Sequence, residues 1–308
     1  MKRVALFGSK GQLGVELKSE FARRGYEVAA FDRSTVDITD AAAVERSMAG
    51  CAPAVVLNAA AYNQVDLAET DPLTAFQVNA LAVRNLAVAC RNSGAQLVHF
   101  STDYVFDGQA GRAYREEDPT RPLGAYAVSK LAGELYARAY LDTPLIIRTS
   151  GVFGPGGMDT ARGNFIELVL RLAAQNNAQN NAENKPLRML EDFVLSPTYA
   201  PALAARTADL VELGAGGTGG IFHIGGGTPI SPFDWAAKIL AAAGLNPPLQ
   251  RTNEREFRTP ARRPKYSALS NAKMEALGIA PMPSLDDAIR EYLLTRAQKP
   301  SVSPTLRP

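Results

Sequence analysis

The N-terminal segment constrains the fold of this chain more than any other part of the sequence. The apolar run Val4–Phe7 leads directly into Gly8-Ser9-Lys10-Gly11-Gln12-Leu13-Gly14, and a helical pattern follows from Leu13 to Arg24. Glycines between a strand and a helix allow a tight turn and let the backbone approach a diphosphate that rests on the helix N-terminus. We therefore predict a nucleotide cofactor in contact with the turn that contains Gly8, Gly11 and Gly14. Turn glycines without a ligand are the alternative interpretation.

Short apolar runs alternate with helical patterns along the first half of the chain. Strands are predicted at Val4–Phe7, Val28–Phe31, Val55–Asn58 and Leu97–Ser101, with helices between them, such as Ala41–Met48. This alternation is typical of a parallel sheet with crossover helices, and continuously apolar strands indicate that both faces are covered. The predicted fold class is α/β, with a Rossmann-type doubly wound parallel sheet as an NAD(P)-binding domain over residues 1–150.

The chain beyond Gly151 is less regular. Four further helices are predicted between short strands and Pro-rich loops: Asn164–Ala174, Ala200–Leu213, Pro232–Ala243 and Leu285–Leu294. We expect a smaller α/β C-terminal substrate-binding region over residues 151–298, from which some of the chain crosses back to the first domain. The polar stretch Asn176–Asn184 is expected to be a solvated loop. Residues 299–308, rich in Pro and Ser, are expected to be a disordered tail.

Charge and composition favour a small-molecule partner. The chain has 33 Lys and Arg against 31 Asp and Glu, a net charge of +2, which argues against nucleic acid or a membrane surface as the main partner. The N-terminus lacks a secretory apolar segment, and no stretch reaches ~18 uninterrupted apolar residues, so we predict no membrane span and a cytoplasmic protein. Cys51 and Cys90 suit buried thiols, and His99 and His223 lie in strand-like runs, which argues against a catalytic metal.

Residues after the second and third predicted strands complete the cofactor site. Asp32 and Arg33 end the second strand, and Asp37-Ile38 follows. An acidic residue there accepts hydrogen bonds from a ribose 2′-hydroxyl, whereas an arginine suits a 2′-phosphate. Because both residue types are present, either NADH or NADPH could be the cofactor. After the third strand, the small residues of Asn58-Ala59-Ala60-Ala61 would let the loop approach the cofactor, although core packing also explains the alanines.

A tyrosine and a lysine four residues apart mark the predicted catalytic centre. Tyr126 and Lys130 lie on one face of a predicted helix, and Thr102 directly follows the strand Leu97–Ser101. A Tyr hydroxyl has a reference pKa of about 10, so a neighbouring cation is needed to stabilise the phenolate. A ketone that accepts a hydride needs a proton donor and a second hydroxyl that holds its oxygen. These residues predict a ketone reductase, in which Asp103 would orient substrate hydroxyls.

Together these motifs resemble the extended short-chain dehydrogenases/reductases, and among them the dTDP-4-dehydrorhamnose reductases, over almost the whole chain. The matching pieces include GSKGQLG, VDITD, NAAAYNQVDLAE, STDYVFDG, YAVSKLAGE and RRPKYSAL. The resemblance implies oxidoreductase activity, namely reduction of the 4-keto group of dTDP-4-dehydro-β-L-rhamnose to dTDP-L-rhamnose with NADPH or NADH. It places Asn79 near the cofactor, and Thr102 and Asp103 against the substrate. The remaining cofactor contacts that it implies are Gly8, Gly11, Gln12, Leu13, Asp37, Ile38, Asn58, Ala59, Ala60, Ala61, Tyr126 and Lys130.

One position departs from the pattern of that family. Where its members read RTSWVFG, this chain has Gly151 in place of a tryptophan that lies against the substrate. Glycine offers no stacking surface, so another 4-keto nucleotide-deoxysugar is an alternative substrate. A non-catalytic NADP-binding regulatory subunit is the alternative from another class of function. Tyr104 favours simple reduction, because related dehydratases carry a glutamate there as an extra acid.

Further residues complete the predicted substrate side and the contacts between copies. Arg262 and Arg263 suit phosphate oxygens, with surface charge as the alternative interpretation. Tyr104 and Gly151 are also expected to contact the substrate. A homodimer is expected from the resemblance, and Glu16 and Glu191 are candidates for a bridging Mg²⁺ at its interface.

Overall fold

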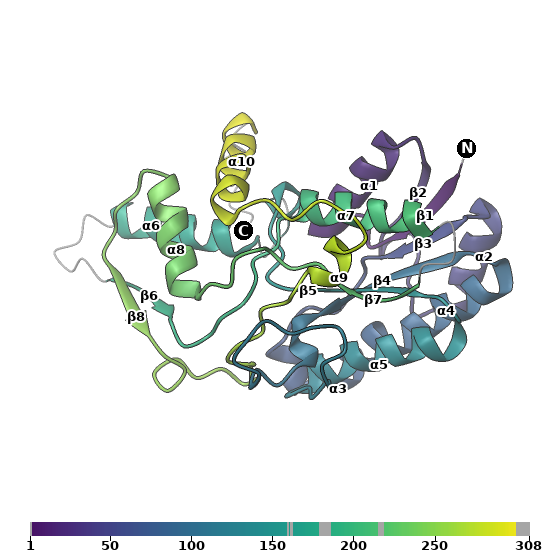
Figure 1. Cartoon of the computed structure of the whole chain (residues 1–308), viewed down its shortest axis with the longest axis horizontal. Helices are drawn as coiled ribbons and strands as arrows, with labels where there is room; N and C mark the ends of the chain where they lie inside the picture. The colour runs from purple at the N-terminus through teal and green to yellow at the C-terminus, as the bar shows by residue number, and fades with distance from the viewer. Residues whose placement is uncertain (1, 159, 161–162, 179–185, 215–218, 300–308) are drawn as a thin grey trace, which may run out of the picture.

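A six-stranded parallel sheet forms the larger part of the molecule (Figure 1). The computed structural model describes residues 2–158, 160, 163–178, 186–214 and 219–299. The strand order is β2-β1-β3-β4-β5-β7, and every neighbouring pair is parallel. The strands are β1 (Arg3–Phe7), β2 (Glu27–Phe31), β3 (Val55–Asn58), β4 (Gln96–Thr102), β5 (Leu145–Thr149) and β7 (Gly220–His223). The predicted α/β class and doubly wound parallel sheet are confirmed.

Helices cover both faces of the sheet. One face carries α1 (Gln12–Arg23) and α7 (Ala200–Leu213); the other carries α2 (Ala41–Cys51), α4 (Ala82–Ser93) and α5 (Ala125–Tyr140). Because successive side chains of a strand point to opposite faces, Leu6 packs under α1 and α7, whereas Phe7 packs under α2 and α4. Both cores are apolar, which is why these strands read as continuous apolar runs. Cys90 lies buried in the second core, as predicted, whereas Cys51 is only partly buried.

A long apolar helical stretch runs from Pro72 to Ser93. It consists of α3 (Pro72–Phe76), a π-helical turn η2 (Gln77–Leu81) and α4. By length and composition alone this stretch would suffice to cross a membrane. Half of the most apolar part of this stretch is buried within the protein, and the stretch packs against α5. It is therefore one of the helices that cover the sheet.

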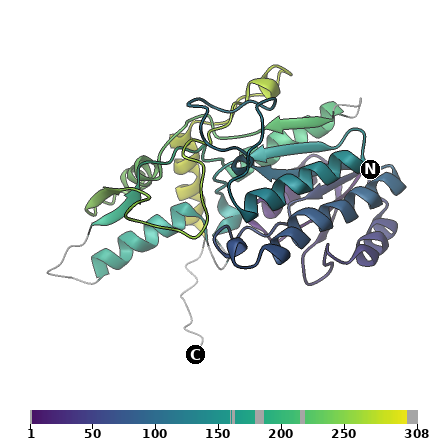
Figure 2. The same ribbon diagram turned by 90° about the horizontal axis from the view of Figure 1, so that it is seen from below.

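The C-terminal half forms a smaller region that projects to one side of the sheet (Figures 1 and 2). It contains α6 (Phe165–Ala178), α8 (Pro232–Ala242), α10 (Leu285–Gln298) and a parallel pair of strands, β6 (Leu187–Leu190) and β8 (Leu249–Thr252). Its core gathers the aromatic side chains of Phe153, Tyr199, Trp235 and Tyr292. The same half of the chain also returns to the main sheet, because it supplies α7 and β7.

The predicted solvated loop Asn176–Asn184 is wrong at its start. Helix α6 continues through Ala178, because adding residues to an existing helix costs little even where they are polar. Residues 179–184 of that stretch, and residues 300–308 of the predicted tail, lie outside the described residues. The short elements are η1 (Leu67–Glu69), η3 (Asp103–Val105), η4 (Pro155–Gly157) and α9 (Ala272–Glu275).

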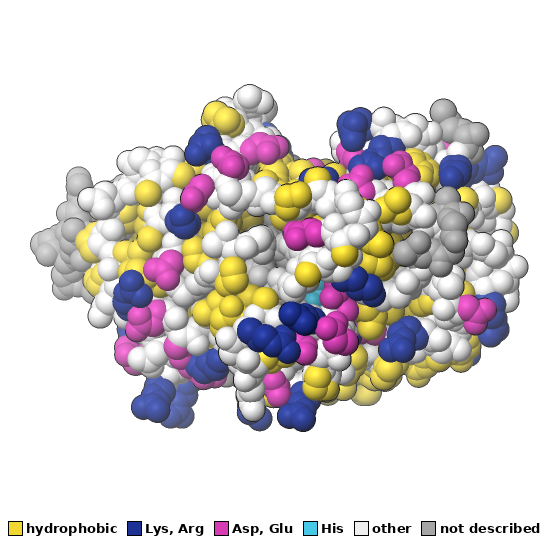
Figure 3. Space-filling view, in the orientation of Figure 1, with side chains coloured by type: hydrophobic (Ala, Val, Ile, Leu, Met, Phe, Trp, Pro, Cys, Tyr) yellow, Lys and Arg dark blue, Asp and Glu magenta, His cyan; other side chains and the backbone are white. Residues whose placement is uncertain are grey.

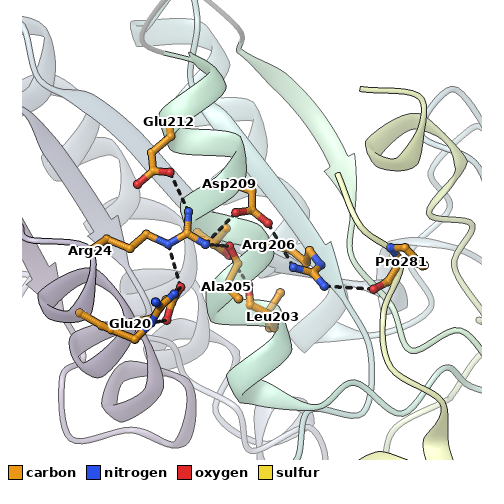
Figure 4. A network of polar contacts seen from close by, with 10 residues as sticks. Glu20, Arg24, Leu203, Ala205, Arg206, Asp209, Glu212 and Pro281 are labelled. Carbon is orange, nitrogen blue, oxygen red and sulfur yellow. Dashed lines mark hydrogen bonds and ion pairs between the residues drawn. The ribbon is translucent and has the colours of Figure 1, made fainter. Parts of the chain in front are cut away.

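Arg24, directly after α1, forms ion pairs that hold α1 against α7 (Figure 4). Its guanidinium forms hydrogen bonds of 2.7 Å with the carboxylates of Glu20, Asp209 and Glu212. Asp209 is shared with Arg206, at 3.2 Å. Since α1 begins at the glycine-rich turn, this network of charges holds the helix on which the turn rests.

Candidate active site

The carboxyl ends of β1, β3, β4 and β5 border one continuous cleft. The chain leaves β1 toward one edge of the sheet and β3 toward the other, and doubly wound sheets bind ligands at such a switch point. A cavity of about 300 Å³ lies at the ends of β4 and β5, and one of about 770 Å³ lies at the ends of β1 and β2. They are two ends of one cleft, because both are lined by Gly11, Ala59, Ala60, Ala61 and Asn63.

The glycine-rich turn fits a diphosphate. A Cβ atom at Gly8 would lie 2.5 Å from the Ala60 nitrogen, and one at Gly14 would lie 2.1 Å from the Gly8 oxygen, so only glycine fits both positions. Gly11 precedes α1 as its N-cap without a side-chain cap. The first N–H groups of α1 are therefore available to an anion. The side chain of Gln12 turns away from them and donates to the Val152 carbonyl at 2.7 Å.

Asp32, Arg33, Asp37 and Ile38 all border the larger cavity, and their contact with a cofactor stays a prediction. Asp32 pairs with Lys10 at 2.6 Å and accepts hydrogen bonds from the Ser34 backbone and hydroxyl. Lys10 and Ser34 together lower the pKa of Asp32 to about 2. Lys10, for which no role was predicted, borders the same cavity. This end of the cleft thus offers two cations and two carboxylates, and it suits either a ribose hydroxyl or a 2′-phosphate.

The loop after β3 is held by two buried asparagines. The Asn58 side chain lies 3.2 Å from His99 Nδ1, and its Oδ1 accepts from the Ala60 backbone. Asn79 donates to the Tyr62 carbonyl at 3.0 Å and accepts from the Tyr62 N–H at 2.8 Å. Tyr62 borders the larger cavity, so Asn79 acts on the cleft through this backbone. His99 is fully buried in β4, as predicted for a core side chain.

Thr102, Tyr126 and Lys130 meet at the smaller cavity. The Tyr126 and Thr102 hydroxyls are hydrogen-bonded to each other, and Lys130 Nζ donates to the Phe100 carbonyl at 2.6 Å. Burial raises the pKa of Tyr126 above its ordinary value, and the hydrogen bond with Thr102 opposes that rise. Burial lowers the pKa of Lys130 to about 8, against the attraction of Glu134. At neutral pH the phenol is therefore protonated and the lysine is charged, a combination that suits a proton donor.

Asp103 is buried beneath the same cavity. Its carboxylate accepts hydrogen bonds from Ser150 at 2.8 Å, Ser267 at 2.5 Å and Thr102 at 3.1 Å. Burial raises the pKa of Asp103 to about 6, although these hydroxyls oppose the rise. The carboxylate thus orients Thr102, and its contact with substrate hydroxyls stays a prediction. Ser150 and Ser267 were given no role from the sequence, although they lie within the RTS and RRPKYSAL motifs.

Tyr104 lies between Tyr126 and Arg263. Its ring meets the Tyr126 ring edge-on, with centroids 6.0 Å apart. Tyr104 is hydrogen-bonded to Arg263, which pairs with Asp66 at 2.8 Å. Burial raises the pKa of Tyr104 to about 12. Arg263 therefore joins the site through Tyr104, whereas Arg262 is exposed at the surface. Phosphate binding by either arginine stays a prediction.

Gly151 borders the smaller cavity with its backbone. Its φ of +51° is one that L residues rarely adopt, and a Cβ atom there would lie 2.7 Å from Leu195 Cδ1. Leu195 is held by two backbone hydrogen bonds with Ile230, at 3.0 and 3.1 Å. A tryptophan at Gly151 would therefore require both a different backbone and a displaced Leu195.

The residues suggested for a bridging cation have other partners. Glu16 accepts from the Gly156 N–H at 2.9 Å, and Glu191 pairs with Arg251 at 3.0 Å. Within the part of the chain that the structure describes, no group of three His, Cys, Asp or Glu side chains could hold a metal ion. Mg²⁺ between two copies stays a prediction. On the face seen in Figure 3, acidic and basic side chains are intermingled, and no large area carries one sign of charge.

Comparison with known proteins matches residues 1–297 to the family model described as the RmlD substrate binding domain. The chain is 38% identical over 306 residues to dTDP-4-dehydrorhamnose reductase of Streptomyces griseus, with 96% of each chain covered. It is 35% identical to the spore coat polysaccharide biosynthesis protein SpsK of Bacillus subtilis (strain 168), over 96% of this chain and 99% of that protein. The crystal structure of dTDP-4-dehydrorhamnose reductase from Bacillus anthracis in complex with NADP is similar, with a TM-score of 0.86, 31% identity, and coverage of 96% of this chain and 99% of that chain.

Proposed function

The chain belongs to the family of the RmlD substrate binding domain, and we propose that it reduces the 4-keto group of dTDP-4-dehydro-β-L-rhamnose to dTDP-L-rhamnose, with NADPH or NADH as reductant. One observation carries the proposal. Thr102, Tyr126 and Lys130 meet at one end of a cleft that begins at a turn shaped for a diphosphate. A proton donor and a dinucleotide site in one cleft are what reduction of a ketone needs.

The chain offers a group for each part of the cofactor. The N–H groups at the start of α1, after Gly11, suit the diphosphate. Asp32, Arg33, Asp37 and Ile38 border the end that would take the adenosine. Ala59, Ala60 and Ala61 border both ends of the cleft, and Asn58 borders the end at Tyr126. When bound, the reduced nicotinamide supplies the hydride.

The chain's own residues supply the proton and hold the oxygen. Tyr126 Oη donates its proton to the ketone oxygen as the new C–H bond forms, so the carbonyl becomes an alcohol and the tyrosine becomes a phenolate. The Lys130 ammonium, one helical turn away, stabilises that phenolate. The Thr102 hydroxyl fixes the phenol and can turn from Asp103 to the substrate oxygen. Thr102 and Lys130 are buried and Tyr126 is partly buried, so less water screens these interactions than at an open surface.

A second candidate, reduction of another 4-keto nucleotide-deoxysugar, is favoured by Gly151. The cavity wall at that position is backbone, and it therefore places fewer limits on the shape of the sugar than an aromatic ring would. The predicted homodimer and cytoplasmic location stay predictions.

The test is a direct assay with purified protein. NADPH or NADH is mixed with dTDP-4-dehydrorhamnose made in place from its precursor, and oxidation of the cofactor is followed by its near-ultraviolet absorbance. Sugar-dependent oxidation, with dTDP-L-rhamnose as the product, is the expected result. Oxidation only with a different 4-keto sugar would support the second candidate. Binding of NADPH without oxidation by any such sugar would refute both and support a regulatory subunit.

A further inference from the structure

A buried ion pair lies behind the catalytic lysine. Arg148 on β5 donates to Glu134 on α5 through two hydrogen bonds, Nε to Oε1 at 2.9 Å and Nη2 to Oε2 at 2.7 Å. Their side chains are only 3% and 2% exposed. Taking two charges out of water is costly, so a buried pair adds little to stability compared with apolar side chains of the same size. The pair therefore calls for a role other than stability.

The pair sits next to the anchor of Lys130. Glu134 follows Lys130 by four residues, so both lie on one face of α5. Lys130 bonds to the Phe100 carbonyl of β4, and Arg148 lies beside the following residue, Ser101, in the parallel register of β4 and β5. Hydrogen bonds from one face of α5 therefore reach two adjacent strands, β4 and β5, at neighbouring positions.

Gly133 brings α5 close enough for these contacts. A Cβ atom at Gly133 would lie 2.2 Å from the Asn79 oxygen and 3.3 Å from His99 Nε2, so the helix approaches η2 and β4 without an intervening side chain. In the segment Lys130-Leu-Ala-Gly133-Glu134, the lysine thus faces the cavity, the glycine permits close packing, and the glutamate reaches Arg148.

Among the residues that the structure describes, Glu134 is the carboxylate whose charge acts directly on Lys130. His99 of β4 faces Lys130, but burial, followed by the charge of Lys130, holds the pKa of His99 well below its ordinary value, so it is neutral. His223 of β7 faces Arg148 and is also neutral, because burial lowers its pKa to about 3. Asp103 of η3 acts on Tyr126. Burial lowers the pKa of Lys130, and Glu134 opposes that fall.

We infer that Glu134 is a positioning residue for Lys130 and that Arg148 partly compensates the buried charge of Glu134. The buried carboxylate keeps the Lys130 ammonium charged at the point where the Tyr126 phenolate must be stabilised. The inference rests on the proposed reductase activity, because the charge of Lys130 matters where Tyr126 gives up a proton.

The test compares the pH dependence of kcat in two variants that remove charges of opposite sign. In the wild type, kcat should fall at alkaline pH as Lys130 loses its proton. Glu134→Gln removes the neighbouring negative charge, so this alkaline limb should move to lower pH by about 1 unit. Arg148→Gln removes a positive charge and leaves Glu134, so the limb should move to higher pH. Arg148→Lys keeps the cation and should return the limb toward the wild-type position.

Asp209→Asn is the matched control. It removes the charge of an arginine-paired carboxylate on α7, at Arg24, and should leave the alkaline limb unchanged. If both Gln variants bind NADPH and keep the wild-type limb, or both shift it in the same direction, the inference is overturned. Should Glu134→Gln fail to fold, the direction of the Arg148→Gln shift decides alone. No turnover by the wild type with any 4-keto nucleotide sugar would refute the proposed function, and the inference with it, before any variant is compared.

Discussion

Replacing Gly14 with alanine should damage both the fold and cofactor binding. The added Cβ atom would lie 2.1 Å from the Gly8 oxygen and 2.9 Å from the Gly8 carbon and from Ser9 Cα. Ordinary contacts between carbon and oxygen are about 3.3 Å or longer, so α1 would have to move away from the turn by more than about 1 Å. Such overpacking against backbone typically costs about 1–3 kcal/mol. The same movement would carry the first N–H groups of α1 away from the diphosphate, and each 1.4 kcal/mol of lost contact weakens binding about tenfold.

Gly50→Ala is the matched control for Gly14→Ala. Gly50 also lies in a helix, α2, but a Cβ atom there would have no neighbour within 4 Å. Alanine should therefore stabilise the protein, by about 0.5–1 kcal/mol. Thermal unfolding and the quenching of protein fluorescence by NADPH measure both effects. If Gly14→Ala retained the melting temperature and the NADPH affinity of the wild type, the close approach of α1 to the turn would not be what shapes the cofactor site.

Three further predictions concern the proton donor, the buried carboxylate and the helix clamp. Tyr126→Phe should lower kcat by about 10²–10⁴-fold and leave NADPH binding intact, because it removes the donated proton alone; near-normal turnover would exclude Tyr126 as the donor. Asp103 has a pKa of about 6 in the folded protein, above its value in the unfolded chain. Protonated Asp103 therefore contributes on the order of 3 kcal/mol to the free energy of unfolding, fully present below about pH 4 and lost as the pH rises through 6. Urea unfolding across that pH range should show a weaker dependence in Asp103→Asn, and equal slopes would contradict the assignment. Arg24→Met should lower the free energy of unfolding by about 1–2 kcal/mol, whereas Arg23→Met, at an exposed position, should change it little. Equal effects would mean that the ion pairs of Arg24 with α7 do not stabilise the fold.

Features encoded in short segments were predictable from the sequence. The turn after β1 needs only a strand, its glycines and a helix, and these are contiguous. Tyr126 and Lys130 could be placed side by side because the helical repeat alone determines which residues share a face. The strands of the sheet were predictable for a similar reason, since burial on both faces leaves a continuous apolar run in the sequence.

Contacts between distant segments were not predictable. Asp103 meets Ser150 and Ser267, which are 47 and 164 residues away, and a serine in a loop carries no local sign of such a partner. Arg263 was proposed for phosphate from its chemistry alone, yet the structure pairs it with Asp66, 197 residues away. The sequence did not indicate the partners of Asn79, which are the Tyr62 backbone and the Ser129 hydroxyl, because the packing of η2 against the loop after β3 and against α5 decides them.

The active site is completed by the second half of the chain. Ser267 supplies the third hydroxyl on Asp103, and β7 covers the edge of β5 that carries Arg148. A nascent chain that has just passed Thr149 would have the glycine-rich turn, Tyr126 and Lys130, but β5 would still be an open edge with unpaired backbone groups. During synthesis the chain should therefore acquire affinity for the dinucleotide before it can catalyse, and an arrest between Thr149 and Gly220, before β7 is made, should yield a binder prone to aggregation and without turnover.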